Sequence, residues 1–276
     1  MSNAIRIRAS SWSGLFDCAY KWEGQNLLGM RMPSSPRALL GTAIHAGTAT
    51  FDLAKLNGKM ASVDEAANDF INALHHPEYE VDWRADDSIN KRSAEVIGLT
   101  LTSDYCNTIS PRYEFAAVEL EITPFNIDCG DGVIIQLTGT LDRCRIRKDN
   151  GGLGISDVKT GSVAVEPDAS GKGRTAKTKG HAAQLGTYEI LAEASLQQLI
   201  TEPAEIIGMK TKGKPEIATG LIYNPRLVML GNEDAPGLIE HAAVMLKSGL
   251  FPPNPSSWVC SQKYCPRWNS CIYKTN

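Results

Sequence analysis

The segment Ile155-Ser156-Asp157-Val158-Lys159-Thr160-Gly161 carries the polar pair on which the predicted fold and site depend. It ends an apolar run that starts at residue 153, a pattern typical of a β-strand. Side chains alternate between the two faces of a strand, so Asp157 and Lys159 share one face. A carboxylate and an ammonium group therefore stand side by side on this predicted strand.

A hairpin connects this strand to the one before it, with Asn150-Gly151 at the centre of a four-residue turn. Counting outward from that turn places Cys144 opposite Asp157. Two residues further along, Asp142 lies opposite Lys159. Cross-strand partners share a face, so these three polar side chains form one predicted cluster. A turn of three or five residues would move Asp142 to the other face.

Two carboxylates and a lysine on one strand pair are suited to phosphodiester hydrolysis. Carboxylate oxygens are preferred ligands of Mg²⁺ and Mn²⁺, and such an ion polarises a phosphate and helps to generate hydroxide. A lysine can orient the attacking water or stabilise developing negative charge. The alternative is a solvated ladder of ion pairs, because Asp-x-Lys is common in exposed strands. The apolar lead-in to Asp157 favours an interior strand.

Hydrophobic periodicity predicts helices before and after this hairpin. We expect helices at residues 37–56, 63–74, 88–108, 181–198 and 238–247, and strands at residues 115–122, 133–147, 153–159, 205–210 and 217–223. This order predicts an α/β fold in one domain, with a mixed central sheet flanked by helices. A helical N-terminal part covers about residues 11–110, the catalytic sheet and helices cover about 113–250, and a cysteine-rich tail covers 251–276.

The 276 residues carry a net charge of −3, which does not favour a protein that coats DNA. A nuclease needs only a local basic surface. Lys172, Arg174, Lys177 and Lys179 supply one, either as a DNA contact or as a solvated, mobile loop. The sequence has no run of about 18 apolar residues and no signal-peptide core near its start. We therefore expect a cytoplasmic protein with no membrane association.

Five short motifs occur in the order found in one known family. They are Ser11-x-Ser13-x-Leu15-Phe16-x-Cys18, Gly41-Thr42-Ala43-Ile44-His45, Gly139-Thr140-Leu141-Asp142-Arg143, Asp157-Val158-Lys159-Thr160-Gly161 and Gln184-x-x-x-Tyr188. Together with the C-terminal cysteines, they resemble the PD-(D/E)XK nuclease superfamily, in its RecB-like branch. The resemblance spans residues 11–271. It implies a restriction-endonuclease-like sheet and a metal-dependent DNA nuclease.

The resemblance implies roles for the residues of the predicted cluster. Asp142 and Asp157 resemble the metal-binding carboxylates, and Lys159 resembles the catalytic lysine. His45 resembles a metal ligand carried on a helix, although a lone histidine on an apolar helix is also a common core residue. Glu119 resembles an upstream acidic residue that some members use.

Gln184 and Tyr188 match a glutamine–tyrosine motif of the RecB-like branch. A spacing of four residues places both side chains on one face of a helix. There we expect them to touch DNA or to support the catalytic site. Simple packing of Tyr188 is the alternative.

Three of the seven cysteines form a group near the C-terminus, with the spacing Cys260-x4-Cys265-x5-Cys271. In a reducing compartment such a group indicates a metal site rather than disulfides. RecB-like nucleases with a [4Fe–4S] cluster imply Cys18 as the fourth ligand, although the first gap in those proteins is usually two residues. A four-cysteine zinc site and four unligated thiols are the alternatives. Either metal site would join the N-terminal helix to the tail.

The leading hypothesis is a metal-dependent DNA exonuclease for end processing, recombination or repair, and a phage gene is one expected source. DNA ends or single strands are the expected substrates. Two alternatives are a non-catalytic nucleic-acid-binding module with a structural four-cysteine metal site, and a metal-dependent hydrolase of a small phosphoester. The sequence has no Gly-x-x-x-x-Gly-Lys-Ser/Thr motif, so translocation along DNA would need a helicase or recombination partner. Homo-oligomerisation stays open.

Overall fold

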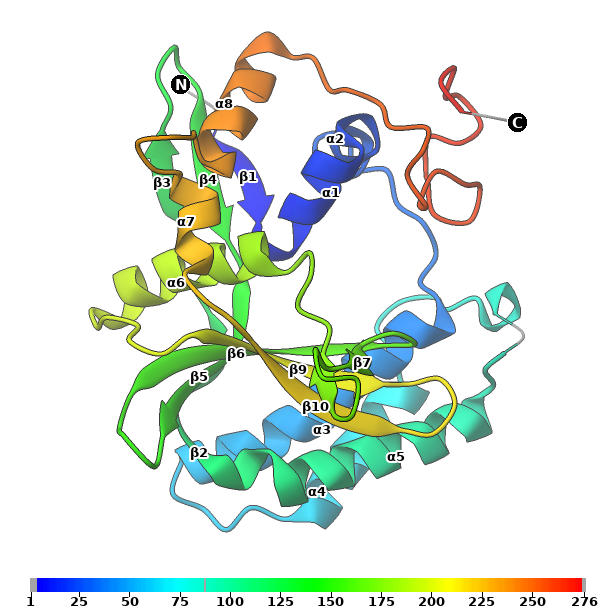
Figure 1. The fold of residues 1–276 in the computed structure, drawn as a ribbon. Helices are drawn as coiled ribbons and strands as arrows, with labels where there is room; N and C mark the ends of the chain where they lie inside the picture. Colours follow the sequence, from blue (N-terminus) through cyan, green and yellow to red (C-terminus); the bar gives the residue numbers. More distant parts are fainter. Residues whose placement is uncertain (1–3, 87, 275–276) are drawn as a thin grey trace.

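The computed structural model describes residues 4–86 and 88–274, and it has a mixed five-stranded sheet between two layers of helices (Figure 1). The strand order is β10-β9-β6-β5-β2. β6 runs parallel to β9, whereas the other neighbouring pairs are antiparallel. The predicted α/β fold, with a mixed central sheet and flanking helices, is therefore confirmed.

The elements have the following bounds. The helices are α1 (Trp12–Asp17), α2 (Ala19–Asn26), α3 (Pro36–Leu56), α4 (Val63–His75), α5 (Lys91–Thr108), α6 (Ala182–Leu196), α7 (Pro225–Leu230) and α8 (Leu238–Ser248). The strands are β1 (Ile5–Arg8), β2 (Tyr113–Glu121), β3 (Phe125–Asp128), β4 (Ile134–Thr138), β5 (Thr140–Arg147), β6 (Leu153–Gly161), β7 (Val165–Pro167), β8 (Arg174–Ala176), β9 (Ala204–Lys210) and β10 (Glu216–Ile222).

Each face of the sheet has its own hydrophobic core. On one face, Val158 of β6 belongs to a core shared with α3, α4 and α5, which includes Phe70. On the other face, Ile155 of β6 belongs to a core shared with α1 and α6, which includes Trp12 and Leu191. Side chains of one strand thus enter opposite cores, as expected for a sheet covered on both faces.

The hairpin of β5 and β6 forms as predicted, but its register differs by two residues. Cys144 pairs with Ile155 and not with Asp157. The turn closes earlier than expected because Gly151, whose φ is 71°, donates its N–H to the carbonyl of Arg147. A glycine adopts this left-handed conformation without steric cost.

The shift changes the partner of Asp142 but not its face. A register change of two residues preserves the alternation of side chains. Continued beyond its last pair, Arg143–Ser156, the observed register places Asp142 opposite Asp157. The expectation that Asp142 lies opposite Lys159 was therefore wrong, whereas the predicted clustering on one face is retained.

The single strand predicted at residues 133–147 is two strands, because the chain leaves β4 and enters β5 at Gly139. β4 belongs to a second sheet with the order β1-β4-β3. A Cβ on Gly139 would lie 2.8 Å from the Tyr188 ring, so glycine allows α6 to pack directly on this junction. The strands β1, β3, β7 and β8 were not predicted, because three or four residues are too short for a periodic signal.

The N-terminal helices α1 and α2 and the C-terminal tail lie side by side (Figure 1). The rings of Trp22 and Phe251 stack with centroids 6.4 Å apart. Arg267 of the tail forms an ion pair with Glu23 of α2. The two ends of the chain thus pack directly against each other. None of the helices described is long and apolar enough to cross a membrane.

Candidate active site

Three side chains from three elements converge where β2 and β5 run side by side under α3. They are His45 of α3, Glu119 of β2 and Asp142 of β5, and their ligand atoms lie within 4.8 Å of one another. Within residues 4–86 and 88–274, no other set of three His, Cys, Asp or Glu residues lies this close. Asp157, which the sequence also placed in the metal set, stands beside this group, close enough for the Asp142 carboxylate to raise its pKa.

A hydrogen bond of His45 determines which ring nitrogen can bind a metal. Nε2 lies 2.9 Å from the carbonyl oxygen of Val158, which can only accept, so Nε2 carries the proton. In the neutral ring Nδ1 is then an unprotonated acceptor, and it faces Asp142 Oδ2 at 3.5 Å. Two facing acceptors repel unless a proton or a metal ion lies between them. The imidazole nitrogen and the carboxylates therefore fit a divalent cation.

Glu119 reaches this group through an unusual backbone conformation. Its φ is 47°, in the left-handed region that non-glycine residues adopt at a cost. Burial, and then the nearby Asp142 carboxylate, raise the pKa of Glu119. Nη1 of Arg143 donates to its Oε1 at 3.0 Å. Strained backbone and a perturbed carboxylate at one position are typical of functional sites.

Asp142 connects these ligands to β6. The β5–β6 ladder ends at the pair Arg143–Ser156, beyond which the strands separate. There Oδ2 of Asp142 accepts a hydrogen bond from the N–H of Val158 at 2.8 Å. The same residue of β6 therefore fixes Asp142 through its N–H and His45 through its carbonyl oxygen.

Asp157 is the centre of a second polar group. Its Oδ2 lies 2.5 Å from Lys159 Nζ, and its Oδ1 accepts a hydrogen bond from Gln184 Nε2 at 2.9 Å. Gln184 Nε2 also lies 3.4 Å from the Tyr188 hydroxyl. Burial raises the pKa of Asp157, the Lys159 ammonium opposes that shift, and the Asp142 carboxylate adds to it. The motif residues from β6 and α6 thus meet beside the three ligands.

A buried ionic network under the site fixes α3 to β5. Arg143 Nε lies 2.6 Å from Asp52 Oδ2, and both side chains are fully buried. The same guanidinium donates to Thr48 Oγ1 at 3.2 Å and to the main-chain oxygen of Asp142 at 2.8 Å. Thr48 and Asp52 follow His45 by three and seven positions, so all three share one face of α3. The network therefore sets where His45 stands relative to β5.

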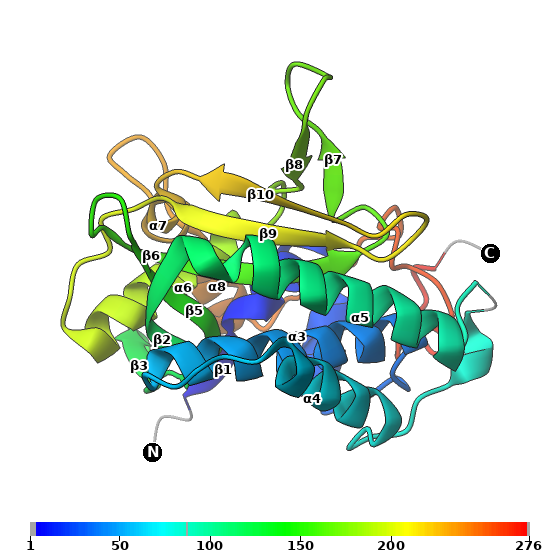
Figure 2. The same cartoon turned by 90° about the horizontal axis from the view of Figure 1, so that it is seen from below.

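The basic segment predicted as a DNA contact does not form one continuous surface. Its first half belongs to the β7–β8 hairpin, which projects from the sheet near β10 (Figure 2). Arg174 in this hairpin forms two hydrogen bonds with the Glu216 carboxylate, at 3.0 and 3.1 Å. Lys172 is exposed in the turn between the two strands. The positive charge of Arg174 is therefore largely neutralised by Glu216.

The second half of this segment runs back toward the site. Burial, and then the charges of Lys159 and Lys177, lower the pKa of His181 to about 4. His181 directly precedes α6, so the charge of Lys177 acts at the start of that helix. Lys179, between Lys177 and His181 in the sequence, is exposed. Of the four basic residues, Lys177 and Lys179 are the two nearest in sequence to α6 and its motif.

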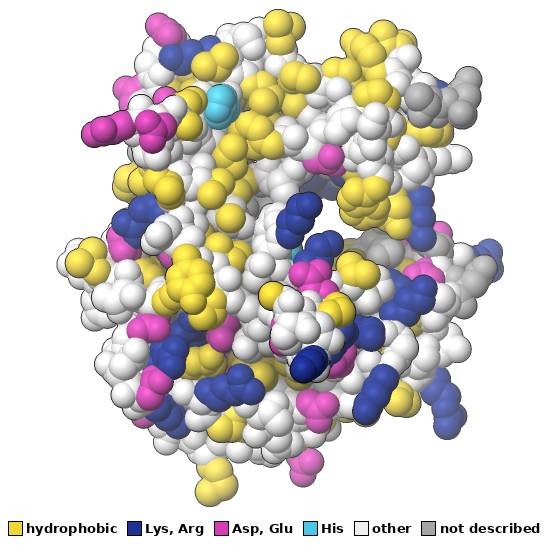
Figure 3. Space-filling view, viewed as in Figure 1, with side chains coloured by type: hydrophobic (Ala, Val, Ile, Leu, Met, Phe, Trp, Pro, Cys, Tyr) yellow, Lys and Arg dark blue, Asp and Glu magenta, His cyan; other side chains and the backbone are white. Residues whose placement is uncertain are grey.

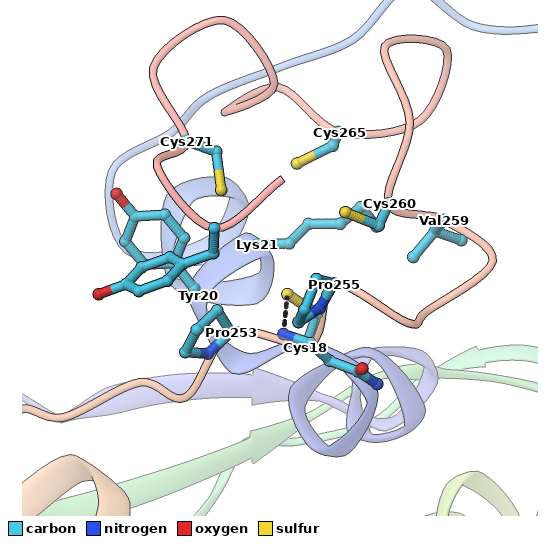
Figure 4. A pocket seen from close by; sticks show the side chains of 11 residues that line it. Cys18, Tyr20, Lys21, Pro253, Pro255, Val259, Cys260, Cys265 and Cys271 are labelled. Atoms are coloured by element: carbon cyan, nitrogen blue, oxygen red, sulfur yellow. Dashed lines mark hydrogen bonds between the residues drawn. The ribbon is translucent and has the colours of Figure 1, made fainter. Parts of the chain in front are cut away.

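The four cysteines predicted as metal ligands line one cavity (Figure 4). Cys18, between α1 and α2, faces Cys260, Cys265 and Cys271 of the tail. Burial, and then the other three thiols, raise the pKa of Cys260. The N–H of Asn254 donates to Cys18 Sγ at 3.4 Å, a contact that stabilises a thiolate. The fold therefore collects all four sulfurs from opposite ends of the chain.

Comparison with known proteins agrees with this geometry. A family model described as the PD-(D/E)XK nuclease superfamily matches residues 7–272. The chain belongs to the PD-(D/E)XK nuclease superfamily. A crystal structure of a protein named as a putative exonuclease from Eubacterium rectale has a similar fold, with a TM-score of 0.50 and 13% sequence identity, and the match covers 99% of this chain and 90% of that one. No curated protein matches this sequence.

Membership confirms the predicted superfamily and gives the site a reaction class. PD-(D/E)XK nucleases use divalent metal ions, and this PD-(D/E)XK nuclease has a group of ligands that suits one. The donors come from His45, Glu119 and Asp142. Glu119 is the member that the sequence indicated most weakly, since its backbone conformation is not visible in the residue pattern.

Proposed function

We propose that this PD-(D/E)XK nuclease is a metal-dependent deoxyribonuclease of the RecB-like branch that acts as an exonuclease. The observation that carries the proposal is the convergence of His45, Glu119 and Asp142 beside the Asp157–Lys159 pair. Acceptors for a cation, from α3, β2 and β5, thus stand beside a donor for a phosphate oxygen on β6. DNA end processing in recombination or repair, with a helicase partner, is the expected setting.

The chain's own residues divide the work of hydrolysis. His45 Nδ1 and the carboxylates of Glu119 and Asp142 would hold Mg²⁺ or Mn²⁺, with Asp157 as an adjacent carboxylate. The bound ion supplies Lewis-acid stabilisation of the phosphate and a lower pKa for bound water. Lys159, held against Asp157, orients the attacking water or neutralises the charge that develops on the phosphate.

Gln184 and Tyr188 act as positioning residues in this proposal. Gln184 donates to Asp157 Oδ1 and leaves Oδ2 to Lys159. Tyr188 is buried and its hydroxyl contacts Gln184, so it restrains the amide. Both side chains therefore fix the orientation of one carboxylate.

The shape of the molecule supports a substrate that enters as a free end or as a single strand. Figure 3 shows a hollow between the part that carries α1, α2 and the tail and the part that carries the sheet and α3 to α5. Lys and Arg side chains lie around this hollow. A confined basic passage admits an unpaired strand or an end more readily than a closed circular duplex.

Digestion of end-labelled DNA tests the proposal. Anaerobically purified protein is mixed with linear and circular DNA, single- and double-stranded, in Mg²⁺, Mn²⁺ or EDTA. We expect metal-dependent loss of linear DNA, with circles spared and no cleavage in EDTA. Cleavage of circles would establish an endonuclease instead. No cleavage by folded, metal-loaded protein would favour a non-catalytic binding module, and hydrolysis of small phosphoesters alone would indicate a different hydrolase.

We propose in addition that Cys18, Cys260, Cys265 and Cys271 hold a structural [4Fe–4S] cluster. A tetrahedral zinc ion, with Zn–S bonds of about 2.3 Å, would bring the sulfurs to within about 3.8 Å of one another. In the part of the chain that the structure describes, no three cysteine sulfurs lie within 4.8 Å of one another. This wider arrangement favours an iron–sulfur cluster over one zinc ion.

Cys265→Ser is expected to reduce bound iron from about four atoms per chain toward zero and to remove visible absorption. The melting temperature should fall as well, because metal binding contributes directly to the free energy of folding. Metal analysis, absorption spectra and thermal melting of anaerobically purified protein measure these effects. Cys129→Ser, outside the cavity, is the matched control. Wild-type protein that contains stoichiometric zinc and no iron would contradict the cluster.

A further inference from the structure

Three pockets, each sharing a lining residue with the next, lie between Tyr188 of the candidate active site and the cysteine-rich tail, and together they are named the N-terminal track. The first pocket lies beside Tyr188 and is lined by Arg6, Arg8 and Ser10. The second pocket also includes Ser10, and it continues along α1 and α2 to Trp258 of the tail. The track therefore joins the N-terminal strand, the first helices and the tail.

The second and third pockets share Gln25 at the end of α2. Lys21 and Arg31 line the second pocket, and Lys263 and Tyr264 line the third. Arg31 donates to the main-chain oxygen of Gln25 at 3.0 Å, which holds its guanidinium at this junction. Basic side chains thus occur in each of the three pockets.

The track is basic in a chain whose net charge is −3. Its basic side chains are Arg6, Arg8, Lys21, Arg31 and Lys263, and its acidic side chains are Asp17, Asp82 and Glu121. Basic side chains thus outnumber acidic ones in the lining of the three pockets. This excess of positive charge suits a polyanion.

The first pocket also offers an unpaired polar group. The hydroxyl of Thr138 is buried without a hydrogen-bond partner in the described residues, and Thr138 lines the pocket together with Arg6 and Arg8. Thr140 lines the same pocket and lies two residues before Asp142, a distance of about 7 Å along a strand. A phosphate bound at Thr140 would therefore lie close to Asp142 of the proposed metal site.

An exposed aromatic pair stands between the second and third pockets. Trp258 is 77% exposed, which is unusual for tryptophan in a folded domain. Its ring makes a T-shaped contact with Tyr264, with centroids 5.2 Å apart. The contact holds the indole in place while most of its surface stays open. Trp258 precedes Cys260 by two residues, so the cysteine cavity positions this segment.

We propose that the N-terminal track binds single-stranded nucleic acid, with the backbone along the basic side chains and an unpaired base stacked on Trp258. The proposal rests on the proposed nuclease function only for cleavage of the bound strand where the track reaches Tyr188. Binding of the strand along the track needs no catalysis. Stacking on an aromatic ring requires a base whose face is free, so bases in the interior of duplex DNA cannot use Trp258. Every base has such a face, so the track is tolerant of sequence.

Equilibrium binding of a fluorescein-labelled oligothymidylate tests the track. All proteins carry Asp157→Ala, so that the probe is not cleaved. Trp258→Ala is expected to weaken binding about 5- to 150-fold, while Trp258→Phe retains most of the affinity. The double variant Lys21→Ala/Arg31→Ala should reduce the slope of log affinity against log salt by about 1.4, because two phosphate contacts are lost.

Matched control variants lie away from the track. Tyr223→Ala removes an aromatic side chain that is 69% exposed, and Lys212→Ala/Lys214→Ala removes two basic side chains at the β9–β10 turn. We expect both controls to bind the probe with wild-type affinity and salt dependence. Thermal melting verifies that each variant is folded.

The outcomes separate the track from the nuclease proposal. Unchanged affinity in both Trp258→Ala and Lys21→Ala/Arg31→Ala would overturn the track, even if the wild-type protein cleaves DNA. Loss of affinity in these variants would support the track, even if the wild-type protein cleaves nothing. Tighter binding of a blunt duplex than of the single strand would also overturn it.

Discussion

Replacing Asp157 by alanine is expected to lower the rate of DNA cleavage at least about a thousandfold while the protein stays folded. Its carboxylate holds Lys159 through Oδ2 and is fixed by Gln184 through Oδ1, next to Asp142. The substitution removes an acidic oxygen beside the metal ligands and releases the lysine at the same time. The loss therefore affects both the cation site and the phosphate donor.

The stability of the metal-free Asp157→Ala protein should not fall with its cleavage rate. Burial raises the pKa of Asp157, so its charged form costs free energy in the folded protein without metal. Removing the carboxylate is expected to leave the melting temperature of the metal-free protein unchanged or higher. An unchanged or higher melting temperature would indicate that Asp157 is present for function and not for stability.

Companion variants make this prediction specific. Lys159→Ala should lower the rate about 100- to 1000-fold, because one donor to the developing charge is lost. Asp64→Ala and Lys212→Ala change exposed side chains of the same types, and we expect wild-type rates from both. The measurement is initial-rate cleavage of end-labelled DNA at saturating Mg²⁺, with melting curves for each protein. Full activity of folded Asp157→Ala would remove this carboxylate from the mechanism.

The placement of Asp157 and Lys159 side by side was predictable because it depends on local alternation. Asp157 and Lys159 are two residues apart on a strand, so their shared face follows from the strand alone. The shared face of Gln184 and Tyr188 was predictable for a similar reason, because residues four positions apart lie on the same face of a helix. Errors in the hairpin turn moved the partner of Asp142 by two residues but preserved its face.

The position of Glu119 was harder to predict from the sequence than that of Asp157 and Lys159. Its place among the ligands depends on a φ of 47° within β2, and the residues around it show no turn signal that would predict this conformation. Arg143 occurs in a recognised motif, but its partner Asp52 is 91 positions away in the chain. Such pairings depend on tertiary packing and have no short-range pattern.

The N-terminal track was also invisible in the sequence. Its walls come from β1, the first two helices and the tail, and β1 itself is only four residues long. The basic segment that the sequence did indicate is partly neutralised within the protein, because Arg174 pairs with Glu216. Charge clusters in sequence therefore gave a poorer guide to the surface than charges brought together by the fold.

Replacing Arg143 by alanine is expected to lower the free energy of unfolding by about 3–5 kcal/mol, because it leaves a buried carboxylate without its counter-charge. Asp52 and Arg143 are both fully buried, with Nε and Oδ2 2.6 Å apart. The melting temperature should fall on the order of 10 °C. Urea titration and thermal melting measure both quantities. Arg147→Ala is the matched control on the same strand.

The control separates burial from ion pairing as the cause. Arg147 also forms ion pairs, with Asp149 and Glu202, but its side chain is 38% exposed. Exposed pairs contribute little, so Arg147→Ala should cost less than about 1 kcal/mol. Equal destabilisation by Arg147→Ala and Arg143→Ala would show that burial of the Arg143 network is not what stabilises the fold.

A double substitution then distinguishes the scaffold from the site. Asp52→Leu/Arg143→Met removes both buried charges and replaces them with apolar groups of similar bulk, so it should recover part of the stability lost in Arg143→Ala. It does not restore the guanidinium that donates to Glu119 and to the main chain of Asp142. We therefore expect a folded protein with weakened Mn²⁺ binding by calorimetry. Wild-type Mn²⁺ affinity in the double variant would mean that α3 and β2 position the ligands without Arg143.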